Sequence, residues 1–370
     1  MPQTLTSRWT EDGCRLDDLR AVLGERTDPA DYPHAAAVEQ EIVVYDLDGF
    51  RAAPSDELVH AFANGPGVVV IRGAFPDTAV IDHATAVFEQ LIAAGTSRGD
   101  HFAAAGSNDR IWNALEKLAV TAPEVFVEYY ANDVIAKVSH AWLGPGYQVT
   151  SQPNVVHPGG KAQVGHRDYH LGFLAPDVIE QYPQHVHRLS PVLTLQGAVA
   201  HSDMPLESGP TLYLPHSQKY GPGYLATNRP EFRGYFVDHH VQLPLRKGDA
   251  AFFNPAVIHG AGGNVSADLH RMANLLQVSS AFGRAMDAVD RTRVCVAVYR
   301  ALRTHPHPEH AIAAAAEGYA FPTNLDRDQP VDGLAPPTQA DVVRQALAED
   351  WTQERFEEAL AAHASKRVTA

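Results

Sequence analysis

The sequence predicts a mainly β fold with flanking helices, and three observations support this class. Between about residues 145 and 283, short runs of β-prone residues alternate with turn signals. Before and after this region, apolar residues recur at helical spacing. The chain has 370 residues, of which 45% are hydrophobic and 20% charged, so it can bury a large core. Several short strands at this spacing are typical of an antiparallel sandwich or barrel.

The elements are predicted in a simple order along the chain. A polar N-terminal leader covers residues 1–40, a single main domain covers 41–300, and a helical C-terminal extension covers 301–370. Within the main domain, helices are expected over 55–140 and the β core over about 145–283. The expected strands cover 68–71, 148–150, 154–156, 192–195, 211–214, 251–253 and 269–282, and the expected helices cover 56–62, 78–94, 109–120, 337–348 and 352–363.

Charge and composition exclude several classes of partner. Acidic side chains outnumber basic ones 44 to 29, which gives a formal net charge of −15, and no run of Lys and Arg is present. Such a surface repels nucleic acid and anionic lipid, so we expect neither as a partner. The two cysteines, Cys14 and Cys295, cannot form a disulfide framework or a thiolate zinc site. Since neither a secretory signal nor a membrane-spanning run is found, we expect a cytoplasmic protein with a small-molecule substrate.

One candidate metal site begins at the triplet His166-Arg167-Asp168. Residues two apart on a strand point to the same face, so His166 and Asp168 can reach one ion. A third ligand is available at His259, which ends an apolar run just before a glycine-rich turn. Two histidines and one carboxylate on one face of an octahedron leave three positions open. This is the ligand set of non-haem Fe(II) oxygenases.

The His-x-Asp pattern occurs twice, because His201-Ser202-Asp203 also matches it. Either triplet alone is more often a polar strand end or a turn than a metal site. A further residue bears on the choice: Arg271 follows His259 inside the predicted strand 269–278. If residues 260–268 form a hairpin connection, Arg271 returns beside the strand that bears His259. A guanidinium there can hold the far end of a dicarboxylic acid by a bidentate pair, or it can be an ordinary strand arginine with a neighbouring partner.

Taken together, these residues closely resemble the phytanoyl-CoA dioxygenase (PhyH) family of Fe(II)- and 2-oxoglutarate-dependent oxygenases. The resemblance is carried by His166-x-Asp168, His259 and Arg271 in this order, with Glu207-Ser-Gly-Pro-Thr-Leu-Tyr-Leu-Pro-His-Ser217 between them. The segment Gly67–Phe75 resembles the first strand of the family. The similarity covers about residues 67–283 and leaves both ends of the chain uncovered.

The resemblance implies a double-stranded β-helix core, that is, a cupin-like jelly roll with the iron at one mouth. It implies that His166, Asp168 and His259 bind Fe(II), and that Arg271 binds the C5 carboxylate of 2-oxoglutarate. It places the His201 triplet at a strand end rather than among the ligands.

Six further side chains are expected in the pocket. Two are assigned to the cosubstrate and four to the substrate: Gln196 and Gln152, then Tyr169, His170, Trp112 and Arg110. Gln196 stands where many family members have an aromatic residue against 2-oxoglutarate. Tyr169 and His170 follow the ligand segment directly, and either line the pocket or pack in its wall. Trp112, with Arg110, either caps the mouth or belongs to the core.

The sequence thus predicts a non-haem iron dioxygenase that uses Fe(II), 2-oxoglutarate and O2, hydroxylates a small molecule, and releases succinate and CO2. Asp168 argues against a halogenase, because halogenases of the wider superfamily lack this carboxylate. Two alternatives remain open: desaturation or cyclisation with the same cofactors in a biosynthetic pathway, or a non-catalytic cupin-like protein that binds a metal or ligand.

Overall fold

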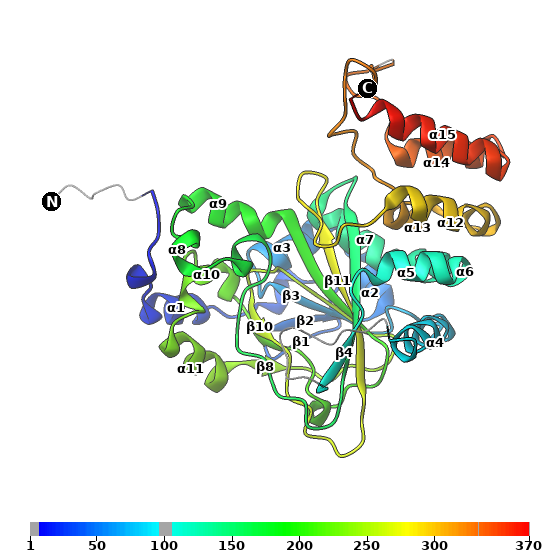
Figure 1. The fold of residues 1–370 in the computed structure, drawn as a ribbon. Helices are drawn as coiled ribbons and strands as arrows, with labels where there is room; N and C mark the ends of the chain where they lie inside the picture. The colour runs from blue at the N-terminus through cyan, green and yellow to red at the C-terminus, as the bar shows by residue number, and fades with distance from the viewer. Residues whose placement is uncertain (1–6, 96–105, 332, 370) are drawn as a thin grey trace.

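The computed structural model describes residues 7–95, 106–331 and 333–369, and within them two β-sheets are enclosed by helices (Figure 1). The described part of the larger sheet has the strand order β1-β2-β3-β9-β6-β11-β5-β4, and the smaller has the order β10-β7-β8. Strand β2 pairs parallel with β3, and the other described neighbours pair antiparallel. The strands of the large sheet are β1 (Ala37–Glu39), β2 (Ile42–Tyr45), β3 (Val68–Ile71), β4 (Asn108–Arg110), β5 (Gln148–Val156), β6 (Thr194–Ala200), β9 (Ala250–Phe253) and β11 (Arg271–Ser279). Those of the small sheet are β7 (Leu212–Leu214), β8 (Val241–Gln242) and β10 (Ile258–Gly260).

Helices cover the outer faces of both sheets. The group on the large sheet comprises α2 (Leu47–Ala52), α3 (Ser55–Ala63), α4 (Ala79–Ala93), α5 (Ala114–Thr121), α6 (Pro123–Tyr130), α7 (Asp133–Leu143), α12 (Arg291–Thr304) and α13 (Glu309–Ala315). The group beside the small sheet comprises α1 (Leu16–Leu23), α8 (Pro176–Ile179), α9 (Gln184–Leu189), α10 (Gly223–Ala226) and α11 (Pro230–His239). In Figure 1, α4, α5 and α6 lie on the right of the strands, and α1, α8 and α11 lie on the left.

Alternation along the strands separates an outer core from the interior between the sheets. In β3, Val69 and Ile71 pack against the helices of the large sheet, whereas Val68 and Val70 face the interior. Successive strand residues point to opposite faces, so a strand buried on both faces is apolar throughout. The β-branched run that the sequence shows here is therefore a strand between two packed layers.

The outer face of the small sheet has its own core. Leu212 and Leu214 of β7 and Ile258 of β10 pack in one cluster with Phe236 of α11. Because the next residue on a strand must point to the opposite face, this packing turns His259 toward the large sheet. The helices on the left of Figure 1 thereby fix the direction of one candidate metal ligand.

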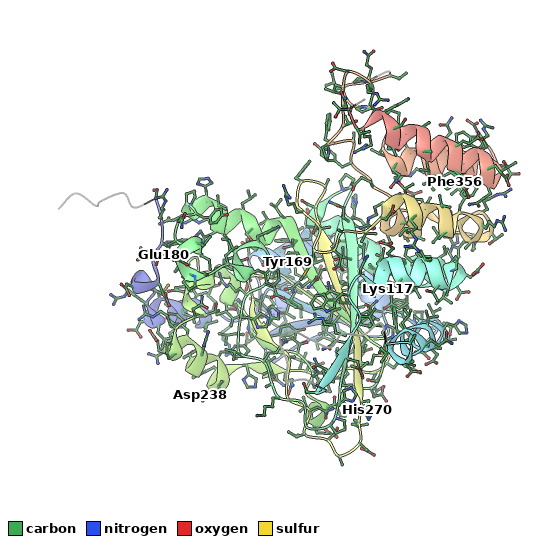
Figure 2. The ribbon with its side chains drawn as sticks, in the orientation of Figure 1. Lys117, Tyr169, Glu180, Asp238, His270 and Phe356 are labelled. Atoms are coloured by element: carbon green, nitrogen blue, oxygen red, sulfur yellow. The ribbon has the colours of Figure 1, made fainter. Side chains whose placement is uncertain are left out.

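The C-terminal helices α14 (Gln339–Ala348) and α15 (Gln353–Lys366) pack on α12. Phe356 of α15, labelled in Figure 2, stacks on Tyr299 of α12 with ring centroids 4.0 Å apart. Thr338 and Asp341 form a capping box at the start of α14, as the sequence predicts. None of the helices in the described chain is both long and apolar enough to cross a membrane.

The structure differs from the predicted elements in three places. More of the described residues lie in helices than in strands, so β structure dominates only around the interior cavity. The helix expected over 109–120 is the short strand β4 followed by α5, because residues 108–110 pair with the end of β5. Residues 190–193 form a 3-10 turn, so β6 begins only at Thr194. Within the expected leader, α1 forms and β1 pairs with β2 at the edge of the large sheet.

Candidate active site

His259 enters the interior from β10. Its ring centroid lies 4.7 Å from that of Phe253 on the large sheet. Its Nδ1 donates a hydrogen bond to the carbonyl oxygen of Val257 at 2.9 Å. A ring nitrogen that donates to a carbonyl carries the proton, so the other nitrogen, Nε2, keeps its lone pair for a metal.

His166 lies beside His259 through a single antiparallel bridge. The backbone N–H of each residue donates to the carbonyl oxygen of the other, at 2.9 and 3.0 Å. The Nδ1 of His166 donates to the carbonyl oxygen of Val164 at 2.8 Å, so its Nε2 is also available as a ligand. The sequence analysis expected a strand here, but only this bridge forms. The reason is that Tyr169 and His170, with φ of 67° and 41°, turn the chain out of the extended conformation.

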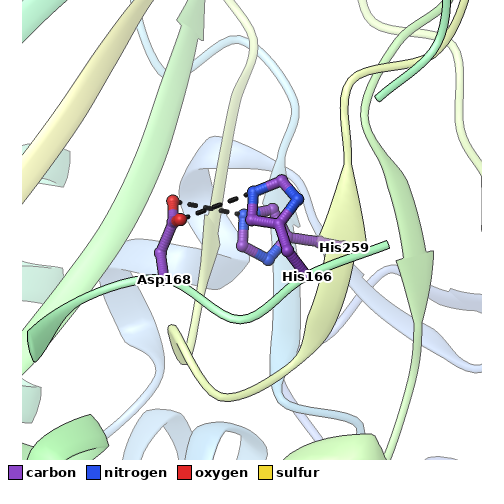
Figure 3. A group of neighbouring side chains, drawn as sticks. All are labelled: His166, Asp168 and His259. Atoms are coloured by element: carbon purple, nitrogen blue, oxygen red, sulfur yellow. Dashed lines mark ion pairs between the residues drawn. The ribbon is translucent and has the colours of Figure 1, made fainter. Parts of the chain in front are cut away.

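Asp168 completes a group of three converging side chains (Figure 3). Its Oδ1 lies 3.4 Å from Nε2 of His166, and its Oδ2 lies 3.6 Å from Nε2 of His259. The three ligand atoms lie within 4.8 Å of one another, and no other such group of metal-binding side chains occurs among the described residues. The structure thus brings together the three residues that the sequence nominates as metal ligands.

The electrostatics of the group suit a divalent cation. Burial raises the pKa of Asp168, but the charge of His166 and hydrogen bonds from His259 and Gln196 outweigh it, so this pKa lies well below its usual range. Burial lowers the pKa of His166. Metal ligands must be an anionic carboxylate and neutral imidazoles, and both shifts favour these states. Two imidazole nitrogens and one carboxylate fit Fe(II) with an open face.

Arg167, between the two ligands of the segment, points to the opposite side and anchors it. Its Nη2 donates to the carbonyl oxygens of Ser217 and Tyr220, at 2.5 and 2.8 Å. The guanidinium carbon lies 5.4 Å from the ring centroid of Tyr224. A Cβ atom at Gly223 would lie 1.9 Å from that carbon, so only glycine fits there. Sequence reasoning missed this role, although alternation already directs Arg167 away from the metal.

Gln196 of β6 acts on the carboxylate ligand. Its Nε2 donates to Oδ2 of Asp168 at 2.5 Å. The residue faces the interior and is buried. Gln196 was expected to contact the cosubstrate, and the contact that the structure contains orients Asp168 instead.

A cavity of about 460 Å³ lies between the two sheets and contains the three ligand side chains in its lining. Arg271, at the start of β11, lines the same cavity and is buried. Burial lowers the pKa of Arg271 to about 10. Its one protein hydrogen bond is a long one, 3.3 Å from Nη1 to the carbonyl oxygen of Gly262. Within the described chain no carboxylate lies within ion-pair distance, so this guanidinium is available to an anion in the cavity.

The expected hairpin between His259 and Arg271 is not what the structure contains. Strand β10 pairs with β7 in the small sheet, whereas β11 pairs with β5 and β6 in the large one. The intervening segment crosses from one sheet to the other and is held by Asn264, whose Nδ2 donates to the carbonyl oxygens of Val156 and Leu269. Arg271 and His259 therefore face each other across the cavity from different sheets.

The other nominated side chains divide between the cavity and its surroundings. Arg110 lines the cavity, and its guanidinium carbon lies 4.6 Å from the ring centroid of Trp112. Gln152 lies behind the lining. Tyr169, near the centre of Figure 2, is buried against Phe173 and His170.

Three of these residues therefore lie outside the lining of the cavity: Gln152, Tyr169 and His170. The Nδ1 of His170 instead lies 3.1 Å from the hydroxyl of Ser190. Trp112 is also outside the lining and touches the cavity only through Arg110. These four side chains pack the wall.

The competing triplet is not a metal site in this fold. His201 is buried, with Nδ1 2.8 Å from the hydroxyl of Thr85 and Nε2 2.9 Å from that of Tyr129. Burial lowers its pKa to about 3. Both ring nitrogens are thus engaged in the outer core, which identifies His201 as a structural residue.

Comparison with known proteins agrees with this site. The family model described as phytanoyl-CoA dioxygenase (PhyH) matches residues 63–273, which include all three ligands and Arg271. The search of curated proteins found no match. The match and the site define the class of the protein as a non-haem iron oxygenase. Within that class, the chain belongs to the phytanoyl-CoA dioxygenase family.

Solved structures with a similar fold are remote in sequence. The epimerase SnoN from nogalamycin biosynthesis is 19% identical, with 61% of this chain and 83% of SnoN covered at a TM-score of 0.42. The carbocyclase SnoK from the same biosynthesis is 20% identical, with 63% and 86% covered at 0.47. HygX from Streptomyces hygroscopicus, solved with nickel and 2-oxoglutarate, is 16% identical, with 62% and 89% covered at 0.44.

Proposed function

We propose that this protein is an Fe(II)- and 2-oxoglutarate-dependent dioxygenase that hydroxylates a small-molecule substrate. In this proposal, the two sheets are the major and minor sheets of a double-stranded β-helix with the iron between them. The observation that carries the proposal is one cavity that combines an open set of three metal ligands with a buried guanidinium that has no carboxylate partner in the described chain.

Each residue has a defined part in this reaction. His166, Asp168 and His259 would hold the metal on one face, and the hydrogen bond from Gln196 keeps the carboxylate turned toward it. Arg271 would bind the far carboxylate of 2-oxoglutarate, for which a planar guanidinium is the suited partner. Bound Fe(II) supplies the redox chemistry by which O2 converts a substrate C–H bond to C–OH, while 2-oxoglutarate loses CO2 and becomes succinate.

The apolar interior favours this chemistry. Tyr213, Leu243 and Phe253 line the cavity between the sheets. Such walls exclude water and strengthen the electrostatic interactions inside the site. A dry cavity also protects reactive species from side reactions with solvent.

The proposal is tested by the products formed from 2-oxoglutarate. Protein supplied with Fe(II), 2-oxoglutarate and air is expected to form succinate and CO2 in equal amounts, slowly even without the primary substrate. Asp168→Ala should abolish this, because the metal loses its anionic ligand. Asp109→Ala is the matched control, since Asp109 also pairs with a histidine, His157 at 2.9 Å, but does not line the cavity. Succinate formation by Asp168→Ala at the wild-type rate would contradict the proposal.

A further inference from the structure

Gln277 lies at the metal end of the cavity. In the register of β11 with β6 it is directly opposite Gln196, the residue that donates to Asp168. Side chains of residues directly opposite across a sheet are neighbours. Arg271 lies six positions earlier on the same strand, about 20 Å away at 3.3 Å per residue. Gln277 therefore flanks the reacting region, far from the site proposed for the distal carboxylate of 2-oxoglutarate.

The orientation of the Gln277 amide is fixed by a chain of hydrogen bonds. Nη2 of Arg110 donates to Oε1 of Gln152 at 3.3 Å, and Nε2 of Gln152 donates to the carboxylate of Asp287 at 3.2 Å. A flipped Gln152 would set its NH2 against a cation and its oxygen against an anion. The same Nε2 donates to Oε1 of Gln277 at 3.1 Å. The oxygen of Gln277 is thus used within the protein, and its NH2 is the group left for the cavity that it lines.

Two other cavity amides are oriented in the same sense. Oδ1 of Asn154 accepts from Nδ2 of Asn108 at 3.2 Å, and Oε1 of Gln163 accepts from the backbone N–H of Ala261 at 3.1 Å. Asn154 and Gln163 both line the cavity. Each of these amides therefore also retains an NH2 group as a donor.

The charges of the lining agree with this pattern. Among the described residues that line the cavity, the one carboxylate is Asp168, which is a metal ligand, whereas Arg271 is cationic. An ammonium group inside this cavity would have no anionic partner of its own, and an unpaired buried charge is strongly disfavoured. A carboxylate or carbonyl oxygen would find several donors.

We propose that the primary substrate carries a carboxylate or carbonyl group that accepts a hydrogen bond from the NH2 group of Gln277. The class is that of organic acids and acyl or keto compounds with an apolar body, since Val164, Phe173 and Met286 also line the cavity. Amines and quaternary ammonium compounds are excluded by the same donors. This inference rests on the proposed function, because it takes the cavity to be the substrate site.

The test compares two probes with one carbon skeleton, 3-phenylpropanoate and 3-phenylpropylammonium. Each is titrated by calorimetry into the full-length protein loaded anaerobically with Fe(II) and saturating 2-oxoglutarate. The carboxylate is expected to bind about tenfold more tightly or better, as a charge-assisted hydrogen bond allows. In Gln277→Glu, which replaces the NH2 donor by an acceptor of the same size, the preference should reverse. Gln345→Glu adds the same charge on exposed α14 and should leave the preference unchanged.

A separate reading distinguishes the two levels of the argument. The visible charge-transfer band of the Fe(II)–2-oxoglutarate chelate reports the proposed function, and it must be present in wild type and Gln277→Glu alike. With the band present, equal binding of the probes, tighter binding of the ammonium, or binding of neither would overturn the substrate class alone. Absence of the band from the wild type would overturn the proposed function and this inference with it.

Discussion

Replacing Arg271 by methionine should remove 2-oxoglutarate binding and at the same time stabilise the metal-free protein. The guanidinium is buried, and its one protein hydrogen bond is 3.3 Å long. Methionine has a similar length and no charge. A residue retained for binding rather than for folding is expected to behave in this way.

The magnitude follows from burial. Burial lowers the pKa of Arg271 from its usual value to about 10. At 1.36 kcal/mol for each pH unit, keeping the charge in the folded protein costs ~3 kcal/mol. The lost hydrogen bond to Gly262 offsets about 1 kcal/mol of this. We therefore expect Arg271→Met to raise the free energy of unfolding by roughly 2 kcal/mol, within the range known for replacing buried charges by apolar residues.

Arg291 is the matched control, because it is equally buried but structural. Its Nη1 and Nη2 donate to the carbonyl oxygens of Ala314 and Val149, at 2.5 and 2.7 Å. Arg291→Met leaves two buried carbonyls without donors, at about 1–3 kcal/mol each. This variant should be destabilised.

The assay is urea unfolding of both variants without metal or 2-oxoglutarate, followed by tryptophan fluorescence. The two midpoints should move in opposite directions from the wild type. If Arg271→Met is destabilised as much as Arg291→Met, then Arg271 is a structural arginine and the reasoning is refuted.

Three further outcomes are expected. Gln196→Leu removes the donor to Asp168 and should weaken Fe(II) binding by about 10–100-fold in calorimetry; unchanged affinity would contradict the orienting role. Arg167→Met frees the ligand segment from the carbonyls beneath it, and Fe(II) binding should weaken by about tenfold, whereas affinity equal to wild type would show that the anchor does not matter. Burial lowers the pKa of His201 to about 3, so between about pH 6.5 and 3 the unfolded chain binds a proton there that the folded protein does not. Stability is therefore lost as the pH falls through this window, and His201→Gln should flatten the decline by up to about 1.4 kcal/mol per pH unit; an unchanged slope in acid denaturation would contradict the assignment.

Local sequence carried much of this architecture. The β-branched run of β3 and the apolar run of β9 are recognisable because both faces of each strand are buried. The ligand pair His166 and Asp168 could be nominated because spacing by two is a local property. His259 could be nominated because it ends an apolar strand.

The remaining features depend on pairing between distant segments. The contact of Gln196 with Asp168 and the position of Gln277 follow from the order of β6 and β11 in the sheet, which no local pattern encodes. The crossing between His259 and Arg271 looks like a hairpin in sequence because its turn residues are the same as those of a hairpin. Only the partners of each strand distinguish the two.

The most direct test of the central claim is an anaerobic titration of the apoprotein with Fe(II) and then 2-oxoglutarate, recorded in the visible range beside Arg271→Met. The account predicts a weak charge-transfer band in the wild type that saturates at one iron per chain and requires a much higher 2-oxoglutarate concentration in the variant. Iron binding without any band on addition of 2-oxoglutarate would contradict it, because the cavity would then hold a metal but not the cosubstrate.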